Sequence, residues 1–251
     1  LFGGYPWRYY KVFDSLSQED FFEQYYDFWQ RLVPKEEKEA LFSQNVLNQI
    51  DLDAPRKVFE RVFTFNDKLK YDTPQDHINN SLYFEIKTFL PGLFLVGDKL
   101  SMAHGLEERF PFMDNDLVDF AMQVPVEHKL GDLTKEIDKI DENLAAKRKT
   151  YREHDDGKNI LRKAMQDYIP EQILNRKKQG FSAPDENWYR GENADYIKEI
   201  LLHSDTMCTE YINEDYIKKI VDEHLDEEKN HRLLIWSFLN FEWWCRIFLK
   251  S

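Results

Sequence analysis

Apolar residues recur at helical spacing along most of the chain. Ser17 followed by Gln18-Glu19-Asp20 has the pattern of a capping box, in which the serine oxygen accepts from an early backbone N–H. Downstream of Ser17 lies an apolar stripe made of Phe21, Tyr25, Phe28 and Leu32. The spacing therefore predicts a helix that begins after Ser17 and ends before Pro34.

The same periodicity predicts further helices over residues 35–50, 56–65, 75–90, 115–122, 158–168, 214–227 and 230–248. Pro55 suits the first turn of the helix that follows it, and Pro91-Gly92 should stop the helix over 75–90. Asp114 or Asn115 should cap the helix that runs to Met122, and Asn213 should cap the helix over 214–227. No stretch alternates with a period of two over the length of a strand, and no internal repeat is found. The chain is therefore expected to be mainly α.

Two of these helices have a predicted buried face. The helix after Pro55 should pack through Val58, Val62 and Phe65. The helix over 158–168 should pack through Ile160, Leu161, Ala164 and Met165.

Composition narrows the classes of function. The 251 residues are 42% hydrophobic, enough for one large or two small domains with a sizeable core. The net charge of −13 argues against binding to duplex DNA or to an anionic membrane, which normally requires a basic face. A local basic pocket for a phosphate-bearing substrate is still compatible with this charge.

Two features of the sequence, its cysteines and its most apolar segment, favour a cytoplasmic location for the protein. Cys208 and Cys245 form no metal-ligand spacing and no disulfide framework, so they are interpreted as reduced thiols. No secretory signal pattern is present. Residues 233–249 are strongly apolar, but they include Glu242 and Arg246 and are too few for a good membrane span. A buried terminal helix explains them better.

The segment 132–158 differs from the rest in composition, because 15 of its 27 residues are charged. We interpret it as a charged surface insertion, the usual structure for such a run. A lid or a partner-docking segment is the alternative. The basic run at 147–149 is too short to indicate nucleic acid.

Three stretches combine glycine, charge and apolar residues without helical periodicity: residues 1–8, 95–114 and 176–184. In the middle one, Asp98 and Lys99 follow the apolar residues 93–96, and a carboxylate and an ammonium leaving a buried segment together can orient a substrate. Glu108 and Arg109 could bind a carboxylate or phosphate, or could instead form an internal ion pair that ties the loop to the core.

Lys178 is the candidate in the third stretch. The flexible Gly180 near it would let its ammonium approach a phosphate group closely, where a positive charge stabilises phosphoryl or nucleotidyl transfer. An exposed basic loop that complements a helix C-terminus fits equally well. The seven histidines show no metal-ligand spacing, so no metal site is predicted within these residues.

In this order, the three stretches resemble the synthetase domain of the glutamine-dependent asparagine synthetase family. Leu1–Tyr5 is similar to the end of the family's loop Glu-Leu-Phe-Gly-Gly-Tyr. Residues 97–114 are similar to Glu-Asp-Arg-x-Ser-Met…Glu-x-Arg-x-Pro-Phe-Leu-Asp, and residues 161–184 to Leu-Arg…Arg-x-Lys-x-Gly-Phe…Pro. Each motif alone is weak, but three in order with comparable gaps are specific, and together they extend to about Gly191.

The resemblance implies a reaction in two steps. ATP activates the side-chain carboxylate of aspartate as an acyl-adenylate, and ammonia, released from glutamine by an N-terminal glutaminase domain, then displaces AMP. By position, Lys178 matches a lysine that stabilises negative charge at the transferring phosphate, and Asp98 and Lys99 match a pair lining the same pocket. Substrate or nucleotide binding is assigned in the same way to Glu108, Arg109, Gly4 and Tyr5.

The chain also departs from the family pattern. Gly97 stands in place of the usual Glu and Lys99 in place of the usual Arg, and a lysine cannot form a bidentate guanidinium contact. The connection over 132–158 is longer than usual. No Ser-Gly-Gly-x-Asp-Ser loop that would hold pyrophosphate is found, nor an N-terminal nucleophilic Cys. The Mg²⁺ carboxylates and most of the parallel sheet are expected upstream of Leu1.

We therefore expect residues 1–251 to be a single partial domain, the helical C-terminal portion of an α/β adenine-nucleotide-binding synthetase, inactive when isolated. Leu1 is interpreted as a position inside a functional loop. One alternative is an amidotransferase or ligase of the same superfamily acting on another carboxylate, such as a sugar acid or a ring-closing amino acid. Another is a helical interaction domain without catalysis. The oligomeric state stays open, with a homodimer among the alternatives.

Overall fold

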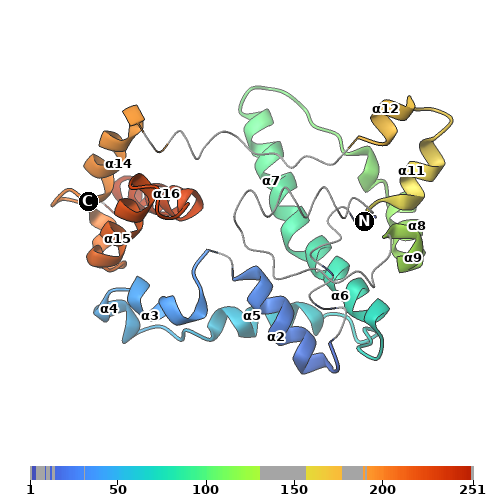
Figure 1. Cartoon of the computed structure of the whole chain (residues 1–251), viewed down its shortest axis with the longest axis horizontal. Coiled ribbons are helices and arrows are strands. Elements are labelled where there is room, and N and C mark those ends of the chain that lie inside the picture. The colour runs from blue at the N-terminus through green and yellow to red at the C-terminus, as the bar shows by residue number, and fades with distance from the viewer. Residues whose placement is uncertain are drawn as a thin grey trace. The chain divides into compact units, whose positions relative to one another are not determined.

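The computed structural model describes residues 2–3, 9, 12, 15–30, 32–130, 157–176, 189 and 191–249. The chain forms two compact units, each made from two separate stretches of sequence. Unit 1 consists of Leu1–Trp29 and Arg56–Gln179, and unit 2 consists of Gln30–Pro55 and Gly180–Ser251. The described residues are mainly helical (Figure 1), and the β pairing among them is limited to one bridge, which confirms the expected mainly α structure.

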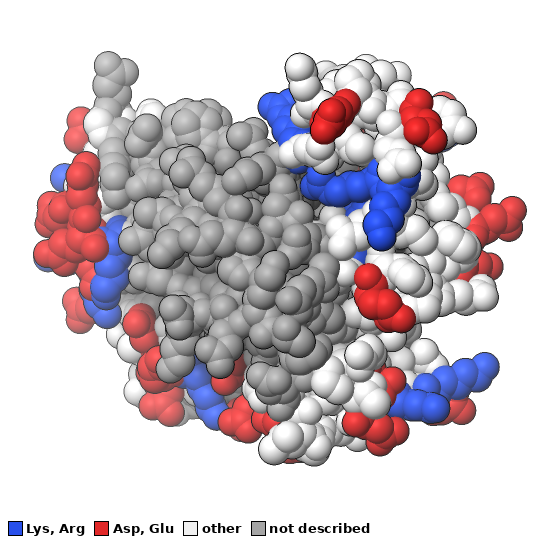
Figure 2. All heavy atoms as spheres, turned by 45° about the vertical axis from the view of Figure 1, so that its right-hand side comes forward, with Lys and Arg blue, Asp and Glu red and all other residues white. Residues whose placement is uncertain are grey.

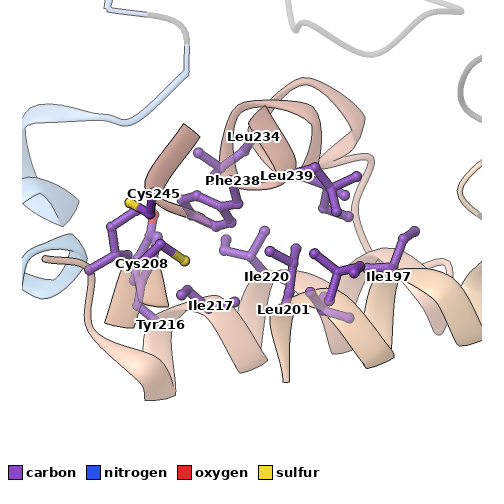
Figure 3. Packing of buried hydrophobic residues seen from close by; sticks show 14 residues of the cluster. Ile197, Leu201, Cys208, Tyr216, Ile217, Ile220, Leu234, Phe238, Leu239 and Cys245 are labelled. Carbon is purple, nitrogen blue, oxygen red and sulfur yellow. The ribbon is translucent and has the colours of Figure 1, made fainter. Parts of the chain in front are cut away.

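Unit 2 is built around a helical core. Its elements are η1 (Lys35–Glu37), α3 (Lys38–Leu41), α4 (Gln44–Leu47), η3 (Gly191–Asn193), α14 (Ala194–Leu201), η4 (Met207–Glu210), α15 (Glu214–Leu225) and α16 (Arg232–Phe248). Figure 3 shows apolar side chains of α14, α15 and α16 packed together, among them Leu201, Ile217 and Phe238. Cys208 and Cys245 are free thiols buried in the same core, and burial raises the pKa of each.

The helices of unit 2 that the sequence predicts most clearly are confirmed. α15 begins after Asn213, whose side chain accepts a hydrogen bond from the backbone N–H of Asp215 at 3.0 Å. α16 covers nearly all of the apolar segment 233–249. Among the described residues, no helix has both the length and the apolar character that crossing a membrane requires.

The expected continuous helix over 35–50 is wrong. η1, α3 and α4 replace it, and the chain between α3 and α4 is extended at Phe42, which forms an antiparallel bridge with Ile212. The Ser43 N–H donates to the Tyr211 carbonyl at 2.9 Å, and the Asn213 N–H donates to the Leu41 carbonyl at 2.9 Å. These long-range hydrogen bonds satisfy backbone groups that a continuous helix would have used locally.

A buried carboxylate joins α16 to η4 in unit 2. Glu242 is fully buried and accepts hydrogen bonds from the backbone N–H groups of Met207 at 3.1 Å and Cys208 at 2.7 Å. Its Oε1 also lies 2.6 Å from the Nε of Arg246. Burial by itself would raise the pKa of Glu242, but the Arg246 guanidinium and the two N–H donors hold this pKa below its ordinary value.

Unit 1 contains the remaining elements among the described residues. These are α2 (Gln18–Trp29), α5 (Ala54–Phe63, whose first two residues belong to unit 2), α6 (Pro74–Lys87), α7 (Phe89–Met102), η2 (Pro111–Met113), α8 (Asn115–Gln123), α9 (Val126–Lys129), α11 (Asn159–Met165) and α12 (Glu171–Leu174). Its largest buried cluster is aromatic and draws on α2, α5 and α6. A smaller cluster brings together Tyr9, Ile78, Leu82, Val126 and Leu130.

α2 begins as predicted. The backbone N–H of Asp20 donates to the Ser17 hydroxyl oxygen at 3.2 Å, and the Asp20 carboxylate accepts from the Leu16 N–H at 2.8 Å. The helix ends at Trp29 instead of Pro34, which leaves Leu32 exposed. The expected start of α8 is confirmed too, with Asp114 as the capping residue.

The predicted buried stripe of α5 is wrong. Phe59 and Phe63 are buried in the aromatic cluster, whereas Val58 and Phe65 are 63% and 71% exposed. The large aromatic rings bury more apolar area than valine does, and they set the rotation of the helix about its axis. Val62 lies beside the buried face and is only partly buried.

The prediction that Pro91-Gly92 stops a helix is wrong, because both residues lie inside α7. The break lies earlier, at Thr88, whose N–H and hydroxyl both donate to the Phe84 carbonyl, at 3.0 and 2.7 Å. α7 begins at Phe89, so Pro91 falls in its first turn, where the missing N–H removes no intrahelical hydrogen bond.

The helix expected over 158–168 is shorter, and its predicted face is not buried. α11 ends at Met165, Ala164 is exposed, and Ile160, Leu161 and Met165 are half-buried. Of the charged segment 132–158, all but Gly157 and Lys158 lies outside the described residues.

Candidate functional site

The central helix of the candidate site, α7, is apolar but has no buried residue. Leu93, Leu95, Val96 and Leu100 are each more than half exposed. A helix that is apolar on most sides is normally covered by other elements, and large exposed apolar surfaces usually mark interaction sites. The expectation that residues 93–96 form a buried segment is therefore wrong for this chain.

The chain reverses direction directly after α7. The N–H of Gly105 donates to the Met102 carbonyl, and the N–H of Leu106 donates to the Ser101 carbonyl, each at 3.0 Å. Gly105 has φ +68°, a left-handed conformation that glycine adopts without strain. The returning loop packs on α7 through the rings of Phe110 and Phe94, whose centroids are 4.3 Å apart.

The returning loop places the Glu108 carboxylate against α7. The Ser101 hydroxyl donates to its Oε1 at 2.8 Å, and its Oε2 lies 2.6 Å from the position that a Cβ of residue 97 would occupy. A side chain at position 97 would force this carboxylate to move. Gly97, the residue that departs from the family pattern, thus leaves room for the Glu108 carboxylate in its present position.

Asp98 and Lys99 occupy consecutive positions in α7, and both side chains are exposed. Consecutive helical residues point about 100° apart, so the two groups do not face each other. Within the described residues, neither side chain forms a hydrogen bond or an ion pair. A substrate could therefore reach either group without displacing a protein partner.

Arg109 forms its ion pair locally. Its Nη2 contacts the Glu107 carboxylate, and its Nη1 donates to the Glu108 carbonyl at 3.1 Å. The side chains of Arg109 and Glu107 are 75% and 68% exposed, so this pair lies at the surface and does not tie the loop to the core. Such an exposed pair contributes little to stability.

Asp98 and Lys99 thus lie on α7, and Glu108 and Arg109 lie on the loop that packs against this helix. The other candidates, Lys178, Gly4 and Tyr5, lie outside the described residues. The sites proposed for them stay predictions.

The N-terminal glycine motif is described in part, at Phe2 and Gly3. Gly3 has φ +66°, and a Cβ there would lie 2.2 Å from Cδ2 of Leu130, so a larger residue would be both strained and crowded. The Phe2 carbonyl accepts a hydrogen bond from the Lys158 N–H at 3.1 Å. The start of the motif is therefore held between the end of α9 and the start of α11.

The segment 157–176 of unit 1 contains several basic residues, although the whole chain is acidic. Residues 157–176 include Lys158, Arg162, Lys163 and Arg176. Figure 2 shows several Lys and Arg side chains close together on one part of this face of the molecule, with Asp and Glu side chains around them.

The described residues do not fit a metal centre. No group of three or more His, Cys, Asp or Glu side chains among them is placed to hold a metal ion. Ligands for the Mg²⁺ that the family resemblance implies would therefore have to come from other residues.

Lys129, at the end of α9, was not predicted from the sequence. Its side chain is only 2% exposed, and burial lowers the pKa of its ammonium. The surrounding sequence Val-Glu-His-Lys-Leu gives no signal for this burial, because Lys129 follows two other polar residues. Those two residues, Glu127 and His128, are exposed.

Comparison with known sequences identifies the class of protein that carries this arrangement. The sequence model of the family described as asparagine synthase matches residues 1–246, so the chain belongs to the asparagine synthase family. No solved structure gives a significant match.

The curated relatives include proteins named glutamine-hydrolysing asparagine synthetases. Asparagine synthetase 1 of Bacillus subtilis is 32% identical over 175 residues, which cover 69% of this chain and 24% of that protein. Asparagine synthetase 3 of the same organism is 26% identical over 238 residues, covering 94% and 33%. A protein of Gibberella zeae named amidase chry2 is 29% identical over 126 residues, covering 49% and 16%. The chain thus spans about a quarter to a third of the synthetases that it matches.

Proposed function

We propose that this chain is the helical C-terminal portion of an enzyme that amidates aspartate to asparagine at the expense of ATP. Membership of the asparagine synthase family over residues 1–246 is the observation that carries the proposal. The three motif stretches fall within that range. Both units would then belong to one partial synthetase domain of α/β type, with the parallel sheet contributed by other residues.

The proposed reaction has two chemical steps. An oxygen of the aspartate side-chain carboxylate attacks the α-phosphorus of ATP, and the bond to pyrophosphate breaks. Ammonia then attacks the acyl carbon and loses a proton, and AMP leaves with one of the original carboxylate oxygens. Ammonia would come from glutamine, hydrolysed by an N-terminal glutaminase domain of the same protein.

The chain's own residues would act by charge and position. Lys178 would stabilise the negative charge that develops at the α-phosphate, as a fixed cation does in transfer reactions at phosphorus. Asp98 and Lys99 would line the same pocket, and their exposure on α7 is compatible with contact to a ligand. Glu108, Arg109, Gly4 and Tyr5 would bind substrate or nucleotide. No step is assigned to Mg²⁺, because the described residues do not form its site.

The exposed apolar surface of α7 supports the view that the site is completed by other parts of the enzyme. Five of its apolar residues are more than half exposed to water, although the helix carries two candidate site residues. We propose that elements of the complete synthetase cover this surface. We also propose a cytoplasmic location, and a homodimer is a further arrangement to test.

The direct test is an assay of the full-length protein with a panel of carboxylic acids, ATP, Mg²⁺ and either glutamine or ammonia. AMP and pyrophosphate should form in equal amounts, and their release should depend on aspartate. Release that depends on another acid, with none from aspartate, would overturn the proposed substrate.

A second function, amidation of a different carboxylate by the same chemistry, has two specific observations in its favour. Lys99 stands where the family pattern has Arg, which changes the geometry available for a substrate carboxylate. Proteins named amidases also match part of the chain, among them amidase chyE of Penicillium rubens, 26% identical over 148 residues. The same panel of acids separates this function from the first.

A further inference from the structure

Lys129 is a buried lysine that the proposed roles above do not use. It is the last residue of α9, and its neighbours Val126 and Leu130 belong to the small apolar cluster with Tyr9, Ile78 and Leu82. The lysine side chain is 2% exposed, so its ammonium has little access to bulk water. Lysine is rarely buried to this degree unless it has a partner.

No such partner is found in the part of the chain that the structure describes. The Lys129 ammonium forms neither a hydrogen bond nor an ion pair there, and desolvation is the cause of its lowered pKa. The carboxylate of Glu85 accepts a hydrogen bond from the Tyr9 hydroxyl at 3.1 Å and does not pair with Lys129. A buried ammonium without an acceptor is strongly unfavourable, so an apolar residue such as Met would suit this place better if nothing bound there.

The position of Lys129 connects it to the N-terminal glycine motif. The Lys129 carbonyl oxygen lies 3.8 Å from the position that a Cβ of Gly3 would occupy, and Leu130 packs directly against Gly3. α9 also packs against α11, whose preceding residue Lys158 holds the Phe2 carbonyl. The buried lysine therefore belongs to the same small region as a backbone turn that requires glycine.

We propose that Lys129 binds an oxyanion, a carboxylate or a phosphate group, in the complete enzyme. An ammonium offers three hydrogen-bond donors and no acceptor, and a charged oxygen is the partner that best offsets its desolvation. The oxyanion can come from a substrate or from a carboxylate of the enzyme itself. The choice of substrates to test rests on the proposed function.

The experiment compares three variants of the full-length protein. Lys129→Met removes the charge and keeps the side-chain length, Lys129→Arg keeps the charge, and Lys163→Met is the control because Lys163 is exposed on α11. Calorimetry measures binding of pyrophosphate, of the non-reactive analogue α,β-methylene-ATP and of aspartate, each separately. Thermal unfolding is measured for every variant without ligand.

If the oxyanion belongs to a substrate, Lys129→Met should weaken binding of the ligand that carries this group at least tenfold. Pyrophosphate and the ATP analogue would respond if the group is a phosphate, and aspartate if it is a carboxylate, while Lys163→Met stays within twofold of the parent. If the oxyanion is a carboxylate of the enzyme itself, Lys129→Met should bind every ligand like the parent but should unfold at a lower temperature or fail to fold. Lys129→Arg, which keeps the charge, should then unfold at a temperature closer to that of the parent.

The proposal is overturned if Lys129→Met binds every ligand like the parent and unfolds at the same or a higher temperature. That result would mean that the ammonium has no anionic partner. If the parent protein itself fails to release AMP with any acid, the proposed function fails, but the unfolding temperatures still decide whether Lys129 has an anionic partner.

Discussion

Two apolar helices of this chain, α7 and α16, differ in how much of their surface is buried. α16 buries Leu234, Ile235, Phe238, Leu239 and Cys245 in the core of unit 2. α7 has no buried residue, although it contains a higher proportion of aliphatic side chains. Hydrophobicity alone thus does not show where a core lies, because an apolar helix can be covered by parts of the protein outside the chain at hand.

The comparison also separates two kinds of charged residue. Glu242 on α16 is fully buried, with donors on both oxygens, and it acts as a structural crosslink. Asp98 and Lys99 on α7 are exposed and have no partner among the described residues. Charges that are paired within the fold serve stability, whereas exposed charges without a protein partner are better candidates for ligand contact.

The largest expected effect concerns the buried crosslink. Glu242→Ala should destabilise the protein by about 3–5 kcal/mol, because it leaves Arg246 and the N–H groups of Met207 and Cys208 without their acceptor. Denaturant unfolding measures the loss. Glu228→Gln, at an exposed position, is the matched control and should stay within about 0.5 kcal/mol of the parent. A similar small effect for both variants would show that the crosslink contributes little.

Truncation of apolar residues contrasts the two helical regions directly. In the 251-residue chain, Ile217→Ala in the core of unit 2 should cost about 2–5 kcal/mol, and Leu100→Ala on α7 less than about 0.5 kcal/mol. In the full-length protein the cost of Leu100→Ala should rise to at least about 2 kcal/mol if its surface is covered there. An equally small cost for Leu100→Ala in both proteins would contradict the proposed covering of α7.

The catalytic prediction concerns Lys178. Lys178→Ala in the full-length protein should slow adenylation at least tenfold, a loss of more than about 1.4 kcal/mol of transition-state stabilisation. Pyrophosphate release in a single turnover measures this step, and the unfolding temperature should not change. Lys163→Ala, which changes an exposed lysine of unit 1, serves as the control. Normal adenylation in a folded Lys178→Ala variant would remove this residue from the site.

The smallest effect is a dependence of stability on pH. The pKa of Glu242 is lower in the folded chain than its ordinary value near 4.5, so below that pH the unfolded chain binds more protons. Its contribution to stability is present above about pH 4.5 and is lost as pH falls through the folded pKa. Each pH unit between the two pKa values corresponds to about 1.4 kcal/mol. Glu242→Gln should flatten the stability curve in that window, whereas an unchanged slope would assign the effect to other groups.

The sequence predicted local features better than their packing. The capping groups Ser17, Asp114 and Asn213 were found correctly, because a cap depends on residues only two or three positions away. The break at Phe42 could not be predicted, since its partner Ile212 is far along the chain. The buried face of α5 was predicted wrongly because helical periodicity does not show whether valine or phenylalanine residues are buried. The structure buries Phe59 and Phe63 in the aromatic cluster and leaves Val58 exposed.

For the candidate site, the sequence identified the residues, and the structure supplied part of their geometry. Gly97 departs from the family pattern, and only the structure shows that the Glu108 carboxylate lies against it. Lys129 could not have been predicted, because its burial depends on contacts between α9 and segments from other parts of the chain. A lysine in a mixed sequence is usually exposed.

Isotope transfer provides the most direct test of the proposed reaction. The full-length protein is incubated with ATP, ammonia and aspartate whose side-chain carboxylate carries ¹⁸O, and the products are examined by mass spectrometry. Attack of that carboxylate on the α-phosphorus predicts AMP containing one ¹⁸O atom for each asparagine formed. Label in inorganic phosphate together with ADP, or asparagine formed without labelled AMP, would contradict the acyl-adenylate route.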